Sequence, residues 1–281
     1  MKRVLITGAN SYIGTSFEKY AKDNSIDFVI DTLDLLDPTW EEFDFSPYDS
    51  IFHVAAIVHK NEKKVDPNIY FSVNRDLPIK LANIAKDKGV KQFVFLSSMS
   101  VYGNQYEEIS LESKEVPNTY YGKSKLEAEN LLEKLNSTSF KVVILRPPMV
   151  YGPNATGNYS KLSKLSKFTA VFPKVENQRS MIFIDNLLEF VRKSIELELA
   201  GLFFPQNIEY VCTSEMVRTI REVGGKNTLL LSIFNPFIKL ISNNGQFKKL
   251  FGNLIYSKEM SNYDFEYQVV NFKDSIRFSE E

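Results

Sequence analysis

The chain has 281 residues, 43% hydrophobic and 13% aromatic, enough apolar material for one large domain or for a domain with an added lobe. Thirty-four basic residues nearly balance thirty-five acidic ones, and a net charge of −1 argues against nucleic-acid binding through bulk electrostatics. The single cysteine, Cys212, excludes an intramolecular disulfide, and with only two histidines a protein-ligated metal is not expected.

Short apolar runs alternate with longer amphipathic ones in the first half of the chain. The apolar runs, each ending at a turn, predict buried strands at 3–8, 27–31, 50–56, 92–98 and 140–147. The amphipathic runs predict helices at 16–24, 76–89 and 124–135, and Gly89 stands where the C-cap of the second belongs. This alternation indicates an α/β fold with a doubly wound parallel sheet, the Rossmann arrangement.

The first apolar run is too short for a secretory signal, and no segment approaches the roughly 18 uninterrupted apolar residues of a membrane span. We therefore expect a cytoplasmic protein. The strand–helix rhythm breaks near residue 155, which predicts a Rossmann domain at 1–155 and a smaller substrate-binding lobe at 156–281. Strand and helix segments near 181–206 are expected to return to the Rossmann domain.

One segment of the lobe, 223–258, contains five lysines, many large apolar residues and no acidic residue. One interpretation is a basic, amphipathic surface that touches an anionic membrane or an anionic substrate. The alternative, which we favour, is an ordinary lobe whose lysines point to water. Pro236 and Gly245 interrupt the segment, so it cannot form one long membrane-surface helix.

The stretch VLITGANSYIG carries a candidate phosphate-binding loop. Gly8 ends the first predicted strand and Gly14 opens the next helix, where free N–H groups and the helix dipole favour a pyrophosphate. Asp31 and Asp34 lie 17 and 20 residues beyond Gly14, near the distance expected of the carboxylate that binds the ribose of NAD. No arginine follows this strand, which favours NAD over NADP.

Six motifs, in this order, are those of a known family: TGANSYIG (7–14), HVAA (53–56), SSMSVYG (97–103), YGKSK (121–125), RPPMVYGP (146–153) and RSMIFIDN (179–186). Through them, about residues 3 to 212 resemble the extended short-chain dehydrogenase/reductases. More narrowly, the chain resembles the NAD-dependent sugar-nucleotide epimerase/dehydratases. The resemblance implies that the glycine loop binds the dinucleotide and that the C-terminal lobe binds a nucleoside-diphosphate sugar.

The resemblance also implies a catalytic set of Ser98, Tyr121 and Lys125. Only Tyr121 stands four residues before a lysine, so the two side chains share a helix face, whereas Tyr120 lies on another face. Oxidising a sugar hydroxyl requires a base for its proton, and a free tyrosine with a pKa of about 10 is rarely ionised at neutral pH. We therefore expect Lys125 to favour the phenolate, and Ser98 to hold the sugar hydroxyl.

Other roles are carried over from the resemblance position by position. It implies that the cofactor also contacts Asn10, Ser11, Tyr12, Ile13, Leu35, Ala55, Ala56, Asn74 and Pro148, as well as Tyr121 and Lys125 of the catalytic set. It implies that substrate contacts, besides Ser98, come from Met99, Asn158 and Arg179, the arginine on the diphosphate. His53 is interpreted as a satisfied core histidine, whereas His59 lies nearer the expected pocket mouth.

Three departures from the family pattern narrow the function. Ser11 replaces the usual middle glycine of the loop, and Met149 replaces an asparagine near the sugar diphosphate. Met99 and Ser100 follow Ser98 where the dehydratases of the family have an aspartate and a glutamate. Without those carboxylates dehydration has no evident acid or base, so we do not expect a dehydratase.

The resulting hypothesis is an NAD-dependent 4-epimerase of a UDP-hexose or UDP-N-acetylhexosamine. A 4-ketoreductase that consumes NAD(P)H would use the same residues and is kept as the alternative. A non-catalytic dinucleotide sensor ranks below both, because the tyrosine and the lysine are present. The family also suggests a homodimer through helix 123–135.

Overall fold

The computed structural model describes residues 1–58, 65–236, 248 and 250–281. It divides into two compact units. The first unit comprises Met1–Asn104, Lys114–Pro147 and Leu188–Pro205, and the second comprises Gln105–Ser113, Pro148–Leu187 and Gln206–Glu281. His59 and part of the acid-free segment 223–258 lie outside the described residues. The domain limits of 1–155 and 156–281 stay a prediction.

The first unit is built on a six-stranded sheet in the order β10-β6-β4-β3-β1-β2. Every neighbouring pair is parallel, and the five predicted strands are all present. The strands are β1 (Lys2–Thr7), β2 (Phe28–Leu33), β3 (Ser50–His53), β4 (Gln92–Leu96), β6 (Lys141–Leu145) and β10 (Gly201–Phe203). The predicted fold class, a doubly wound α/β sheet, is confirmed.

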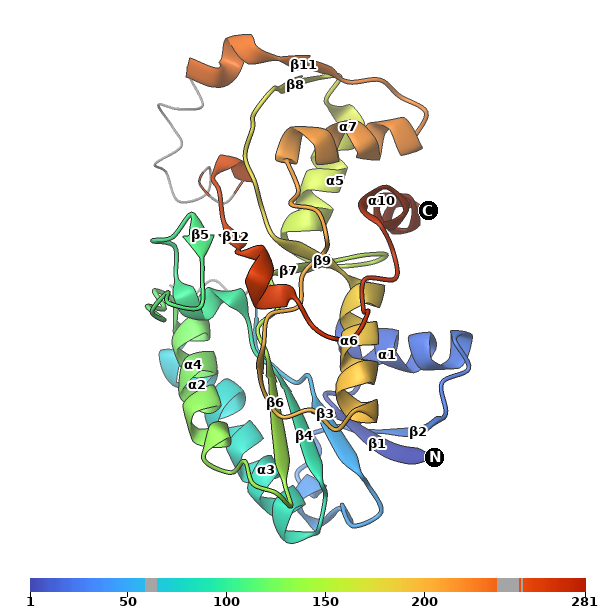
Figure 1. Cartoon of the computed structure of the whole chain (residues 1–281), viewed down its shortest axis with the longest axis vertical. Helices are drawn as coiled ribbons and strands as arrows, with labels where there is room; N and C mark the ends of the chain where they lie inside the picture. The colour runs from blue at the N-terminus through green and yellow to red at the C-terminus, as the bar shows by residue number, and fades with distance from the viewer. Residues whose placement is uncertain (59–64, 237–247, 249) are drawn as a thin grey trace. The chain divides into compact units, whose positions relative to one another are not determined.

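Helices cover both faces of this sheet because successive strand residues point to opposite sides. On one side, Phe17 of α1 (Tyr12–Asp23) meets Phe52 of β3 at a ring distance of 5.5 Å. On the other side, α3 (Leu77–Asp87) and α4 (Tyr120–Glu133) pack into an apolar cluster that contains Ile51. Figure 1 shows the two groups of helices on either side of the strands.

The chain changes direction between β1 and β3. From β1 it passes to β2 at the edge of the sheet, and then returns to β3 on the other side of β1. Parallel α/β sheets bind their ligands at the carboxyl ends of the strands, at such a switch point. Gly8 and Ala55 follow β1 and β3 and therefore lie at this place.

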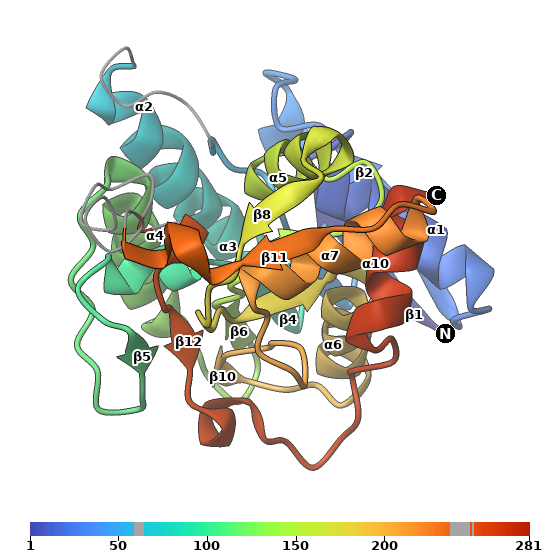
Figure 2. The same ribbon diagram turned by 90° about the horizontal axis from the view of Figure 1, so that it is seen from above.

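The second unit contains three short pairs of parallel strands and several helices (Figures 1 and 2). The pairs are β5 (Glu108–Ile109) with β12 (Ile255–Tyr256), β7 (Met149–Tyr151) with β9 (Met181–Phe183), and β8 (Val171–Pro173) with β11 (Leu229–Leu231). The helices are α5 (Asn158–Phe168), α7 (Thr213–Val223) and α10 (Phe272–Glu280), while α6 (Ile184–Glu196) begins in this unit and ends in the first. The 3₁₀ helices of the two units are η1 (Trp40–Glu42), η3 (Met99–Tyr102), η4 (Ser232–Phe234) and η5 (Lys258–Ser261).

A buried tyrosine organises the core of the second unit. The Tyr151 hydroxyl is 2.6 Å from the Ser275 hydroxyl and accepts a hydrogen bond from the Asn207 amide at 3.0 Å. These bonds connect β7, α10 and the segment after β10. Over the described ranges, no helix is both long enough and apolar enough to cross a membrane.

Candidate active site

Ser98 lies just beyond the end of β4, at the start of η3. Its Oγ accepts a hydrogen bond from the Ser100 N–H at 3.1 Å, which caps the short helix. The following Met99 N–H donates to the Pro147 carbonyl at 2.9 Å, so the backbone here is tied to the segment after β6. Ser98 is therefore held at the carboxyl end of the sheet, where the switch-point rule places a ligand.

Tyr121 occupies the second position of α4, and two local features bring it to Ser98. Thr119 caps the helix by accepting a hydrogen bond from the Gly122 N–H at 3.0 Å. A Cβ on Gly122 would stand only 2.6 Å from the Ser100 carbonyl oxygen, so a glycine is needed for the helix to approach this loop. The close approach lets the Tyr121 hydroxyl hydrogen-bond to the Ser98 side chain.

Lys125 lies one helical turn beyond Tyr121 and is almost fully buried. Its Nζ donates to the Leu96 carbonyl at 2.8 Å and sits 4.4 Å from the centre of the Phe95 ring. Burial lowers the pKa of Lys125 to about 7, although the nearby Glu129 carboxylate acts in the opposite direction. The ammonium is thus held against the end of β4.

The pKa of Tyr121 differs from the expectation. Burial of the phenol raises its pKa to about 12, and the hydrogen bond with Ser98 lowers it by less than burial raises it. Because Lys125 is directed to the Leu96 carbonyl, it is not among the groups that shift the Tyr121 pKa. In the chain alone, the phenol is therefore neutral at physiological pH and can donate a proton.

Asn74 lies in a π-helical turn, η2 (Ser72–Asp76), between the short helix α2 (Pro67–Phe71) and α3. Its side-chain oxygen accepts from the Ile57 N–H at 2.8 Å, and its amide nitrogen donates to the Ile57 carbonyl at 3.1 Å. The same nitrogen is 3.3 Å from the Ser124 hydroxyl on α4. Asn74 therefore ties the segment after β3 to the helix that carries Tyr121. Such π turns recur at functional sites, but a sequence pattern does not reveal them.

A buried ion pair adjoins the catalytic candidates and was missed by sequence reasoning. Glu129 follows Lys125 by one helical turn, and Arg146 binds its carboxylate through three hydrogen bonds of 2.6 to 3.2 Å. Arg146 also donates to the Tyr102 hydroxyl at 2.7 Å and to Glu115 at 2.8 Å. The spacing of Tyr121, Lys125 and Glu129 on one helix face was the available signal.

The glycine loop has the geometry of a phosphate cradle. Gly8 has a φ of 115°, and a Cβ there would stand 2.7 Å from the Ala55 N–H nitrogen, so only glycine fits. Asn10 also has a positive φ, 63°, and Ser11 accepts a hydrogen bond from the Gly14 N–H at 3.1 Å. Ser11, the departure from the family glycine, therefore serves as the N-cap of α1.

The remaining first-unit cofactor candidates lie around this loop. Tyr12 and Ile13 begin α1, Ala55 and Ala56 follow β3, and Asp34 and Leu35 follow β2. The Gly8 N–H donates to the Leu33 carbonyl at 3.2 Å, so the end of β2 lies beside the loop. The residues predicted around the dinucleotide in the first unit are thus brought together, and the cradle fits a dinucleotide pyrophosphate.

The two candidate ribose carboxylates are placed differently. Asp34 follows β2 directly and is exposed, and within the described part of the chain its carboxylate accepts only a local bond from the Leu36 N–H at 2.9 Å. Asp31 lies three residues earlier, where it accepts from Arg3 and from the Tyr48 hydroxyl, both at 3.0 Å. Those hydrogen bonds lower the pKa of Asp31, and the bond from Arg3 has the larger effect. Asp34 is therefore the carboxylate beside the glycine loop.

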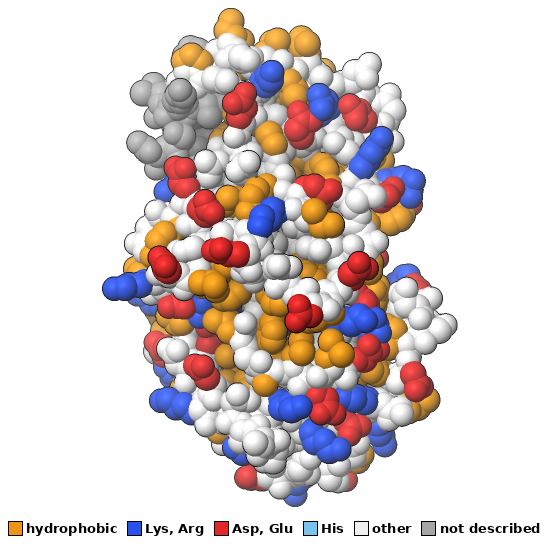
Figure 3. All heavy atoms as spheres, in the orientation of Figure 1, with side chains coloured by type: hydrophobic (Ala, Val, Ile, Leu, Met, Phe, Trp, Pro, Cys, Tyr) orange, Lys and Arg blue, Asp and Glu red, His pale blue; other side chains and the backbone are white. Residues whose placement is uncertain are grey.

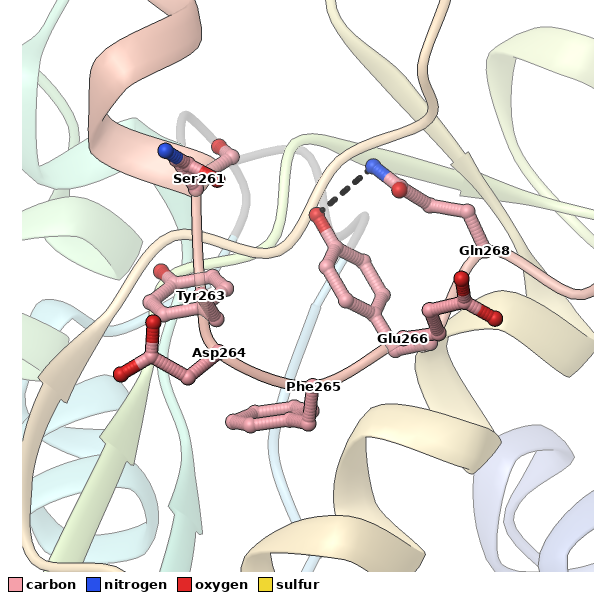
Figure 4. A pocket seen from close by; sticks show the side chains of 8 residues that line it. Ser261, Tyr263, Asp264, Phe265, Glu266 and Gln268 are labelled. Atoms are coloured by element: carbon pink, nitrogen blue, oxygen red, sulfur yellow. Dashed lines mark hydrogen bonds between the residues drawn. The ribbon is translucent and has the colours of Figure 1, made fainter.

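Pro148, Asn158 and Arg179 belong to the second unit. Asn158 is exposed at the start of α5, and Arg179 donates to the Gly252 carbonyl at 3.1 Å. Burial lowers the pKa of Arg179. A hollow in this unit, of about 370 Å³, is formed along the loop 261–268 (Figure 4) and contains none of these three residues. In that loop the Tyr263 and Phe265 rings stack at 5.6 Å, so much of it is structural.

His53 is a core histidine, as predicted, but it is not fully satisfied: its Nε2 is buried and has no hydrogen-bond partner among the described residues. Its Nδ1 is 2.8 Å from the Thr7 hydroxyl, and its ring stacks on Phe93 and Phe95. Burial lowers its pKa to about 3, so it is neutral at physiological pH. Among the residues that the structure describes, no group of three or more His, Cys, Asp or Glu side chains could hold a metal ion.

A doubly wound sheet with a glycine cradle at its switch point, and a serine, tyrosine and lysine at the adjoining strand end, characterises the extended short-chain dehydrogenase/reductase enzymes. The sequence model of the NAD dependent epimerase/dehydratase family matches residues 4–196. The chain belongs to this family. It is an NAD-dependent epimerase/oxidoreductase of the extended short-chain type.

Similar proteins agree with this assignment. A UDP-glucose 4-epimerase of Vibrio cholerae is 29% identical over 90% of this chain and 86% of its own length. An N-acetyl-alpha-D-glucosaminyl-diphospho-ditrans,octacis-undecaprenol 4-epimerase of Escherichia coli O157:H7 is 27% identical over 70% of this chain and 64% of its own. The crystal structure of a dTDP-4-dehydrorhamnose reductase from Clostridium acetobutylicum has a TM-score of 0.76 at 19% identity, covering 98% and 97% of the two chains. At that identity the likeness concerns the fold.

Proposed function

We propose that this protein is a 4-epimerase of a nucleotide-linked sugar, a UDP-hexose or a UDP-N-acetylhexosamine, that keeps its NAD through turnover. The observation that carries the proposal is the Ser98–Tyr121 hydrogen bond beside buried Lys125, with no carboxylate at Met99 or Ser100. This set can move one proton at a sugar hydroxyl but has no acid–base pair for eliminating water. Both curated relatives described above are named as 4-epimerases.

The side chains divide the work by position. Tyr121 exchanges the proton of the C4 hydroxyl, as a base in oxidation and as an acid in reduction. Ser98 holds the C4 oxygen, because its hydroxyl already reaches the phenol oxygen. When bound, NAD would supply the acceptor and then the donor of the hydride at C4. In the chain alone Lys125 donates to the Leu96 carbonyl and does not shift the Tyr121 pKa, so it would favour the ionised tyrosine only once cofactor and substrate occupy the site.

For the cofactor we propose NAD, with Asp34 on the adenine ribose. Asp34 lies directly after β2, beside the loop formed by Gly8, and among the described residues its carboxylate forms no ion pair. Asp31 is committed to Arg3 and Tyr48. A carboxylate at this place binds the ribose hydroxyls and repels the additional phosphate of NADP. In the second unit, Arg179 is proposed to bind the substrate diphosphate, assisted by Asn158.

The first test is to purify the protein without added nucleotide, denature it and identify the released nucleotide by chromatography. The proposal predicts close to one NAD or NADH per chain. The Asp34→Asn variant should retain much less, whereas Asp31→Asn should retain nearly as much as the parent. A protein that emerges empty and binds NADPH reversibly would instead identify a 4-ketoreductase, which would use the same Ser98, Tyr121 and Lys125.

A further inference from the structure

Helix α5 of the second unit has an unusual outer face. Its inner face is a regular stripe of buried residues at helical spacing, Tyr159, Leu162, Ser163 and Ser166. The opposite stripe is exposed and has the same spacing: Lys161, Lys164, Leu165 and Phe168. An outer face is normally polar, but Phe168 is 89% exposed here. Two large apolar side chains and two lysines therefore share one solvent-facing stripe.

The exposed apolar surface continues beyond the end of α5. Val171 in β8 and Leu229 in β11 are direct partners in the parallel pair, and both are exposed. The next element, η4, contacts β8 and exposes Ile233 to 72%. Figure 3 shows hydrophobic side chains at the top of the view, over the β8–β11 pair. We call Leu165, Phe168, Val171, Leu229 and Ile233 the apolar patch.

The chain segments that carry the apolar patch contain only basic charges. Residues 157–175 have four lysines and no acid, and residues 223–236 have one lysine and no acid. One of these lysines, Lys167, pairs with Glu280 at 3.1 Å. The nearest acids along the chain, Glu176 and Glu222, lie outside both segments. Lysines with long apolar stems at the margin of an apolar surface can remain solvated while the surface is covered.

We propose that the apolar patch, with Lys161 and Lys164 beside it, docks on the surface of an anionic lipid bilayer. The apolar side chains would enter the boundary between headgroups and acyl chains, and the lysines would meet lipid phosphates. Charge complementarity decides between partners. Partner proteins typically match a basic patch with a few specific carboxylates, whereas scattered apolar tips on chain segments that carry lysines and no acid of their own suit a uniformly anionic, deformable plane. The proposal goes beyond the proposed epimerase function and does not depend on it.

Such an attachment is peripheral and reversible. Each lysine near an anionic leaflet is worth about fivefold in binding. Replacing both Lys161 and Lys164 by glutamine should therefore weaken binding about 25-fold. Phe168→Ser should weaken it about tenfold, since one inserted aromatic ring is removed from the contact. All three side chains are exposed, so these changes leave the core of the second unit intact.

The test is sedimentation of the 281-residue chain with vesicles of phosphatidylcholine, with and without phosphatidylglycerol. We expect binding only to the anionic vesicles, weakened by added salt and reduced by the Phe168→Ser and Lys161→Gln/Lys164→Gln variants. Matched controls are Leu197→Ser and Lys88→Gln/Lys134→Gln, which alter an exposed apolar residue and two exposed lysines in the first unit. Circular dichroism verifies that each variant is folded.

Three results would overturn the proposal. No sedimentation with either kind of vesicle would exclude a lipid surface as the partner. Binding that the patch variants share equally with the controls would assign the contact to another surface. Concentration-dependent self-association that Phe168→Ser abolishes, without vesicle binding, would identify the apolar patch as an interface between copies of the chain.

Discussion

Replacing Lys125 by methionine should abolish catalysis and stabilise the fold near neutral pH. Methionine has a similar length and fits an apolar environment, while the lysine is almost fully buried beside Phe95. The pKa of Lys125 falls from 10.5 to about 7 in the folded protein because burial disfavours the ammonium. The free-energy cost of burying an ammonium is absent in the methionine variant.

The magnitude follows from linkage. Below pH 7 the lysine is charged in both the folded and the unfolded state, and burying the ammonium costs about 5 kcal/mol of folding free energy. This cost falls as the pH rises, to about 2 kcal/mol at pH 9, and vanishes above pH 10.5, where the lysine is also neutral in the unfolded chain. Losing the hydrogen bond to the Leu96 carbonyl costs about 1–3 kcal/mol at every pH. Lys125→Met should therefore gain about 2–3 kcal/mol at pH 6.5 and almost nothing at pH 9.

The assay is urea unfolding of nucleotide-free protein at pH 6.5 and pH 9, followed by tryptophan fluorescence. Trp40, the single tryptophan, lies in the core cluster of the first unit, the unit that contains Lys125. Lys123→Met is the control, because Lys123 is exposed on the same helix. Two results would refute this account of the buried lysine. The Lys125→Met variant could be no more stable than the parent at either pH, or its increase in the free energy of unfolding could be the same at pH 6.5 and pH 9.

Three other substitutions probe the site. Tyr121→Phe should lower kcat by about 100- to 10,000-fold, whereas Tyr120→Phe should leave kcat nearly unchanged in the same steady-state assay. Equal losses of kcat in the two variants would disprove the assignment of Tyr121 as the proton-transferring tyrosine. Glu129→Gln leaves Arg146 short of a buried anion and should lower the free energy of unfolding by about 3 kcal/mol or more, measured by urea unfolding; an unchanged midpoint would contradict the buried pair. Gly8→Ala should lower nucleotide affinity at least about tenfold, since its strained φ costs about 1–3 kcal/mol, as calorimetric titration will measure; normal affinity would contradict the cradle.

The sequence predicted the sheet of the first unit well for a physical reason. Strands covered on both faces are continuous apolar runs, and all five predicted runs are strands. The pairs of the second unit carry no such signal. For example, β5 and β12 contain two residues each and join positions 108–109 to 255–256. Strands this short have no periodicity to detect, and their partners are distant along the chain.

In the candidate site, too, the features set by local spacing were predictable from the sequence, and the features set by tertiary packing were not. Spacing alone placed Tyr121 and Lys125 on one helix face, and the strand–loop–helix context placed Gly8. The partnership of Glu129 with Arg146 is long-range, and the burial that raises the Tyr121 pKa to about 12 arises only after packing. The choice between Asp31 and Asp34 required the hydrogen bonds of Arg3, which the sequence places 28 residues away from Asp31.

The most direct test of the proposed epimerase uses a UDP-N-acetylhexosamine or UDP-hexose deuterated at C4, followed by NMR without added cofactor. The account predicts that the two C4 epimers interconvert, that deuterium stays at C4 because the same enzyme-held cofactor returns it, and that Tyr121→Phe stops the exchange. Conversion that requires stoichiometric NADH or NADPH, or loss of the label to the cofactor pool, would contradict the account.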